Sequence, residues 1–319
     1  HDEQEKPSVS MSNATYLQAV DDQVRLMLAK ANAMHPEFEE DCLTAPGLIK
    51  EHWIDEVRFE YVSRIADSAL RADASTMYDD GGRLGSDLLG LFSPAIGRRR
   101  VNRIQVQWRR GEFTPRRNFT LLHELGHYLQ QTDDELAGRI CMINSANYEK
   151  RFEEDSCNRF ASKALLPDEL MRGKIKSSGL GVRLADELYE ESRQNAGRNV
   201  RVSRDVIVQR IGDFLPGEGR VAMTLTTRTI RDYGRKGVTR EPQVRCRVHG
   251  DRMVDYGGDL KAEERLLLDE ARELLFRKRD ILEVGADMFS QLPPEGRPVG
   301  ATIAKSYGKQ EYAFMMFEY

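Results

Sequence analysis

The sequence predicts an α+β protein, with a mainly helical first region that includes a small sheet and a small α+β second region. Three observations predict this. Apolar residues recur at helical spacing through much of the first region, one short segment there alternates like a half-buried strand, and threonine-rich, alternating segments follow Pro216. We therefore expect a flexible arm at 1–12, a first domain at 13–215 and a second domain at 216–319.

The first domain is expected to begin with helices and continue into a strand. Leu17, Val20 and Val24 share one face of an amphipathic helix. A second helix is expected from about 48 to 70. Alternating apolar and polar residues at 103–108 then predict a half-buried strand.

Three later helices are expected to complete this domain. One begins near Arg116, and another covers about 151–166, where Pro167 ends it because proline disfavours helix at the preceding residue. A third covers 203–214 with a serine as its N-cap.

The second domain is expected to combine strands with one helix. Strands are predicted near 221–230 and 244–248, followed by a helix over about 261–282. Two further strands are predicted at 301–306 and 312–317. This arrangement is typical of a small α+β domain.

The composition excludes several classes of protein. The chain has 319 residues, 40% hydrophobic and 31% charged, with a formal net charge of −4, so its overall charge does not favour nucleic acid or membrane surfaces. Its apolar runs are shorter than the roughly 20 residues of a membrane-spanning helix. Four widely spaced cysteines are expected to be reduced, and we expect a cytoplasmic location: Cys42, Cys141, Cys157 and Cys246.

The motif H-E-x-x-H at 123–127 predicts a catalytic metal site. On a helix, residues four apart share a face, so His123 and His127 can bind one Zn²⁺ ion. Glu124 lies beside the first ligand and is the candidate general base toward a water activated by zinc. The alternative is a surface helix that holds two histidines without binding a metal.

The third metal ligand is expected from the acidic helix at 151–166. Glu154 and Asn158 are four residues apart, so Glu154 can bind zinc while the Asn158 amide oxygen accepts the outer N–H of a ligating histidine. Asp155 is the second candidate for the ligand. A solvent-exposed acidic face is the alternative without a metal.

These motifs together resemble the ImmA/IrrE metallopeptidases. The resemblance is carried by R-N-F-T-L-L-H-E-L-G-H at 117–127, by E-x-x-x-N-x-F-A at 154–161 and by the L-L-P at 165–167, within a region of about 80–215. It implies a zincin-like fold of the gluzincin type, with His123, His127 and Glu154 as zinc ligands.

The resemblance also implies a regulatory function. Members make a limited cut in a helix-turn-helix repressor, which derepresses stress or defence genes, and some respond to DNA damage through single-stranded DNA. The CapP-type peptidases of anti-phage operons are the preferred subgroup, with 216–319 as a sensor domain. The alternative is a zinc-stabilised binding protein that sequesters a repressor or antitoxin without cutting it.

Two weaker signals concern regulation. Eight arginines and one acidic residue lie within 98–117, together with Trp108, which favours contact with single-stranded nucleic acid. The alternative is a solvated or protein-docking basic face. The candidate contacts to nucleic acid are Arg98, Arg99, Arg100, Arg109 and Arg110.

Cys157, within one turn of Glu154, is a candidate regulatory thiol that could block the open zinc position. The alternative is a buried apolar cysteine.

A further residue is expected to stabilise the oxyanion of the reaction. The sequence does not choose among its candidates, Tyr128, Tyr148, Tyr256 and His249.

Overall fold

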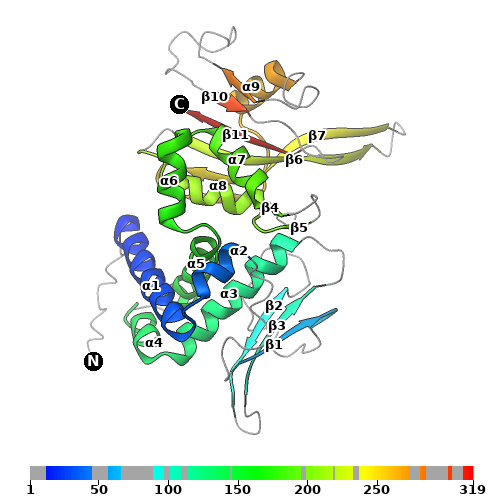
Figure 1. Ribbon diagram of the computed structural model, residues 1–319. Coiled ribbons are helices and arrows are strands. Elements are labelled where there is room, and N and C mark those ends of the chain that lie inside the picture. The colour runs from blue at the N-terminus through cyan, green and yellow to red at the C-terminus, as the bar shows by residue number, and fades with distance from the viewer. Residues whose placement is uncertain are drawn as a thin grey trace, which may run out of the picture. The chain divides into compact units, whose positions relative to one another are not determined.

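The fold is described from a computed structural model, and the α+β class is confirmed (Figure 1). The structure describes residues 12–44, 57–65, 89–96, 101–108, 114–143, 146–194, 199–217, 220–232, 237–272, 281–284, 301–303 and 312–318. These fall into two compact units. The first draws on 1–75, 90–108 and 119–164, and the second on 76–89, 109–118 and 165–319. Residues 1–11 of the expected arm lie outside the description.

The helices of the first unit carry the residues singled out above. They are α1 (Asn13–Met34), α2 (Phe38–Thr44), α3 (Thr114–Thr132), α4 (Asp134–Cys141) and α5 (Ala146–Leu165). Of α3 the part from Phe119 onward belongs to this unit, and of α5 the part up to Ala164. The Ser12 hydroxyl caps α1 by accepting from the Thr15 N–H. As predicted, Val20 and Val24 lie on the buried face of α1. The Phe38 ring of α2 stacks on Phe160 of α5, with 5.9 Å between their centroids.

A three-stranded sheet with the order β1-β3-β2 belongs to the same unit. Its strands are β1 (Val57–Val62), β2 (Gly90–Ser93) and β3 (Asn102–Gln107), with β1 parallel and β2 antiparallel to β3. The strand predicted at 103–108 is confirmed. The helix predicted over 48–70 is wrong, because its described part, 57–65, contains β1. There Val57, Phe59 and Tyr61 alternate with polar neighbours, and β-branched and aromatic residues favour a strand.

The second unit is built on a six-stranded sheet with the order β8-β7-β6-β11-β10-β9. The strands are β6 (Arg220–Asp232), β7 (Gly237–His249), β8 (Val254–Tyr256), β9 (Leu282–Val284), β10 (Ala301–Ile303) and β11 (Ala313–Glu318). The short pair β4 (Arg193–Gln194) and β5 (Asn199–Val200) stands apart from it. The helix predicted at 261–282 is confirmed by α9 over Ala262–Arg272, residues 273–280 lie outside the described residues, and Leu282 at its predicted end instead begins β9.

Three helices of the second unit precede this sheet in the chain. They are α6 (Asp168–Ser178), α7 (Val182–Ser192) and α8 (Arg204–Gly212), and the Ser203 hydroxyl caps α8 as predicted. On α8, Asp205 accepts hydrogen bonds from Thr224 and Arg245 of the sheet. These helices therefore group with the C-terminal sheet. The domain boundary expected between residues 215 and 216 stays a prediction.

None of the four cysteines, which all lie in the described part of the chain, is in a disulfide. Among the described residues, no helix is long and apolar enough to cross a membrane.

Candidate metal centre

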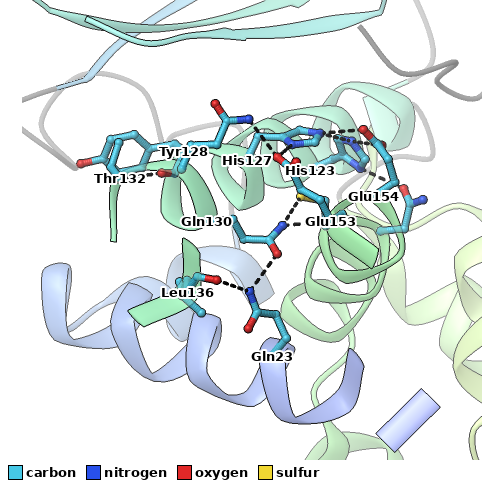
Figure 2. Close-up of polar contacts among 12 residues, drawn as sticks. Gln23, His123, His127, Tyr128, Gln130, Thr132, Leu136, Glu153 and Glu154 are labelled. Carbon is cyan, nitrogen blue, oxygen red and sulfur yellow. Dashed lines mark hydrogen bonds and ion pairs between the residues drawn. The ribbon is translucent and has the colours of Figure 1, made fainter. Parts of the chain in front are cut away.

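Helix α3 brings the two motif histidines together inside the first unit. Leu121, Leu122 and Leu125 are each at most 1% exposed, so this part of the helix is buried. His123 and His127 are one turn apart, and their Nε2 atoms lie 3.1 Å from each other. Figure 2 shows the two imidazoles side by side, next to Glu154. The buried helix provides a rigid base for the site.

The third group of the cluster is the Glu154 carboxylate on α5. Its Oε2 lies 3.4 Å from His123 Nε2, and its Oε1 lies 3.4 Å from His127 Nε2. These three residues form a cluster whose ligand atoms are mutually close. The second candidate, Asp155, instead accepts a hydrogen bond of 2.7 Å from the Tyr16 hydroxyl of α1. Glu154 rather than Asp155 therefore completes the cluster.

The outer nitrogen, Nδ1, of each histidine lies beside an oxygen acceptor, which is a carboxamide for one histidine and a carboxylate for the other. The Asn158 Oδ1 lies 2.9 Å from His123 Nδ1, where the sequence placed it. Glu153 Oε1 lies 2.8 Å from His127 Nδ1 and also accepts from Gln131 Nε2 at 2.8 Å. Oxygen acceptors at both Nδ1 atoms put the imidazole protons there, which leaves both Nε2 lone pairs for a metal.

Glu153 was missed by the sequence reasoning, although it was one of three consecutive acidic residues on α5. The spacing rule selected Glu154 because it shares a helix face with Asn158. No rule of spacing within one helix could show that His127 Nδ1 on α3 faces the neighbouring residue.

The candidate general base, Glu124, lies in a confined environment. It is 3% exposed, and burial raises the pKa of its carboxyl, while the two imidazoles and a hydrogen bond from the Phe92 main chain act in the opposite direction. Strand β2 also approaches closely, since a Cβ on Gly90 would lie 2.4 Å from Glu124 Oε1. A carboxylate with a raised pKa suits proton transfer near neutral pH.

The two imidazoles of the cluster favour the ionised form of the Glu154 carboxyl. Burial opposes ionisation of Glu154, but hydrogen bonds and charge from His123 and His127 outweigh it and lower the pKa of this carboxyl. The pKa of Glu153 is also lowered, against burial, by its hydrogen bond to His127. Two carboxylates near two imidazoles can therefore compensate the charge of a divalent cation.

The donor set and its spacing fit zinc. Tetrahedral Zn²⁺ with ligand distances of about 2.05 Å separates neighbouring ligand atoms by about 3.3 Å. The three separations here are 3.1, 3.4 and 3.4 Å. Two imidazoles and one carboxylate with a fourth position left over are the ligand set of a catalytic rather than a structural zinc site. His123, His127 and Glu154 are thus suited to hold the ion.

Comparison with protein families assigns this part of the chain. Residues 112–211 match the family model of the IrrE N-terminal-like domain, Peptidase_M78. The chain carries a domain of the ImmA/IrrE family. The match includes α3 with the H-E-x-x-H motif and α5 with Glu154 and Asn158, which carry the whole cluster.

Other comparisons add little to this assignment. The solved structure of a Mycobacterium tuberculosis transcriptional regulator aligns with 95% of this chain and 80% of that chain, at 13% identity and a TM-score of 0.42. A likeness this weak carries no functional argument. No curated protein matches the sequence. The CapP-type subgroup stays a prediction.

Cys157 of the IrrE N-terminal-like domain lies on the inner side of α5. It is fully buried, and its sulfur accepts a hydrogen bond from Gln130 Nε2 at 3.0 Å. Burial raises the pKa of its thiol to about 11, although the neighbouring His127 imidazole acts in the opposite direction. The sulfur is not part of the cluster formed by the two Nε2 atoms and Glu154. These contacts favour the alternative of a buried, protonated thiol over a regulatory one.

The remaining candidates are either outside the described residues or engaged elsewhere. Arg98, Arg99, Arg100, Arg109 and Arg110 lie outside the description, as does the side chain of Tyr148. Tyr128 is 2% exposed and packs edge-on against Phe92. In the second unit, His249 pairs with Asp255 and the Tyr256 hydroxyl accepts from Gln209.

Proposed function

We propose that this chain is a zinc-dependent endopeptidase of the ImmA/IrrE family. The observation that carries the proposal is the set of three ligand atoms at the spacing of a tetrahedral zinc site, with the buried carboxylate of Glu124 next to the first of them. A structural zinc site would use a fourth protein ligand, and the described cluster has three.

The residues divide the work of peptide hydrolysis between them. Zinc bound by His123, His127 and Glu154 would polarise the scissile carbonyl and acidify water. Glu124 accepts a proton from the attacking water and returns it to the leaving amine nitrogen. Asn158 and Glu153 hold the two imidazoles in the tautomer that the ligand role requires.

The proposed substrate is a helix-turn-helix transcriptional repressor, cut once, so that stress or defence genes are derepressed. This rests on the family assignment. Single-stranded DNA is the proposed activating signal, which the arginine-rich run at 98–117 supports by its composition. The second domain, 216–319, is the proposed sensor.

The test incubates the purified zinc-loaded protein with the repressor encoded beside it, with and without single-stranded DNA and a chelator. We expect one discrete, chelator-sensitive cut. Glu124→Gln should retain one zinc per chain and lose the cut, and His123→Ala should lose the zinc. Cutting by Glu124→Gln at the wild-type rate would contradict the mechanism. A stable complex with an uncut repressor would instead favour the zinc-stabilised binding protein.

A further inference from the structure

A chain of buried amides joins the N-terminal helix to the back of the metal centre. Gln23 of α1 and Gln130 of α3 are both 0% exposed. Gln23 Nε2 donates to Gln130 Oε1 at 3.0 Å and to the Leu136 carbonyl of α4 at 3.2 Å. Figure 2 shows this chain running from α1 to the cluster. All of these residues belong to the first unit.

Hydrogen bonds from Gln130 extend this chain of amides to α5. Its Nε2 donates to the main-chain carbonyl of Glu153 at 3.1 Å and to the sulfur of Cys157 at 3.0 Å. Its Oε1 accepts from Gln23, so donors and acceptor of this amide are all used. Because Gln23 can only donate with its nitrogen, it fixes which way round the Gln130 amide lies.

The carbonyl that Gln130 holds belongs to the residue that orients His127. Glu153 Oε1 lies 2.8 Å from His127 Nδ1, and His127 Nε2 is one of the three ligand atoms. Gln130 is one turn after His127 on α3, so its hydrogen bond to Glu153 fixes the axial position of α5 against α3 at this point. A shift of α5 along its axis would move both Glu153 and Glu154.

The amide pair is not explained by stability. Gln23 Oε1 is buried with no hydrogen-bond partner, and such an atom costs free energy that two apolar side chains would avoid. Buried polar groups that do not maximise stability can instead specify one geometry. The geometry specified here is the register of the two helices that carry the ligands.

We propose that Gln130 is a positioning residue for the metal centre, which holds Glu153 and hence His127 in place, and that Gln23 of α1 orients it. This inference rests on the proposed zinc site. It also gives α1, which precedes the segment matched by the family, a role in that site.

The test measures zinc affinity by competition with a chromogenic chelator, together with the melting temperature of the zinc-free protein. Gln130→Met keeps the volume and removes the donors, and we expect its zinc dissociation constant to rise about tenfold, at the lower end of the effect of outer partners. Ser156→Ala removes a buried, unpartnered hydroxyl from α5, the helix of Glu153 and Glu154, and serves as the control, with unchanged zinc affinity.

The double variant Gln23→Met/Gln130→Met separates positioning from stability. Because the double variant removes both amides of the Gln23–Gln130 hydrogen bond, neither amide is left buried without the other. Its melting temperature should therefore return toward that of the wild type. Its zinc affinity should stay reduced about tenfold, because Glu153 still lacks its donor. The visible spectrum of the Co²⁺-substituted variants should also change, since it reports ligand geometry.

Four outcomes would overturn the inference, the proposed function or both. Wild-type zinc affinity in Gln130→Met, or affinity that recovers with melting temperature in the double variant, would overturn the positioning role. A wild-type protein that binds no zinc would overturn both this inference and the proposed function. Zinc binding that depends on Gln130, without any cleavage, would overturn the endopeptidase alone.

Discussion

Strand β2 confines the candidate general base, and Gly90→Ala tests this contact. A Cβ at position 90 would lie 2.4 Å from Glu124 Oε1, 2.7 Å from Glu124 Cγ and 2.6 Å from Thr120 Cγ2. Real Cβ atoms essentially never approach closer than 3.0 Å, so the Glu124 carboxylate must move by at least the difference, 0.6 Å. The three proposed zinc ligands are not among these neighbours. The substitution should therefore displace the base and leave the ligands in place.

The expected effect of Gly90→Ala is on the rate and not on metal content. Displacement of a catalytic group by about 1 Å costs on the order of 100-fold in rate, so we expect a loss of about 10- to 100-fold in kcat/KM. The assay measures cleavage of the repressor per bound zinc, with zinc content determined by mass spectrometry. Gly138→Ala is the matched control, because a Cβ there meets nothing within 4 Å.

The outcome of this experiment is decisive in two ways. Gly138 lies in helix α4, so its replacement by alanine should leave the rate unchanged and stabilise the fold by up to about 1 kcal/mol. Gly90→Ala with the wild-type rate would refute the confinement of Glu124 by β2. Loss of zinc from Gly90→Ala would show that the strand supports the ligands instead.

Three further predictions concern the ligands and their packing. Asn158→Ala should weaken zinc binding by about 10- to 100-fold, measured by chelator competition, because His123 loses the acceptor at Nδ1. Gly126→Ala should lower the free energy of unfolding by about 1–3 kcal/mol in a urea titration, since its Cβ would lie 3.0 Å from Cys157 Sγ and 3.2 Å from Met27 Cε. Free zinc at about 100 times its dissociation constant should stabilise the wild type by about 2.7 kcal/mol, and His123→Ala should abolish this shift in melting temperature.

The metal cluster could be predicted from the sequence because its parts follow local helical geometry. His123 and His127 are four residues apart, and so are Glu154 and Asn158. Each pair therefore shares a helix face in any fold that keeps the two helices. That Gly126 leaves room for another element also followed from its lack of a side chain, and α5 takes up this room.

The sheet of the first unit was harder to predict because its strands depend on partners elsewhere in the chain. Val57, Tyr61 and Ile65 fit a helical face, while Val57, Phe59 and Tyr61 fit a strand. The pairing of Val57–Val62 with Asn102–Gln107, some 45 residues later, decides between them. Local periodicity contains no information about that partner.

Two further parts of the site could not be predicted from the sequence for the same reason. Gly90 and the Phe92 main chain, which approach Glu124, come from β2, a strand of four residues that carries no helical or alternating signal long enough to be recognised. The acceptor of His127 comes from α5, and the amides behind it come from α1 and α3. Each of these contacts joins segments that are distant in sequence.

The proposed metal ligands and some of the residues that support them lie in different parts of the chain. All three ligands and Asn158 lie within 112–211, the segment that the family model matches. Strand β2, which approaches Glu124, and α1, whose Gln23 donates to Gln130, both lie before it. Because burial raises the pKa of Glu124, a fragment limited to 112–211 would expose this carboxylate and lower its pKa, even if it still bound zinc. The base strength of Glu124 and the orientation of Gln130 thus both depend on segments that precede the matched one.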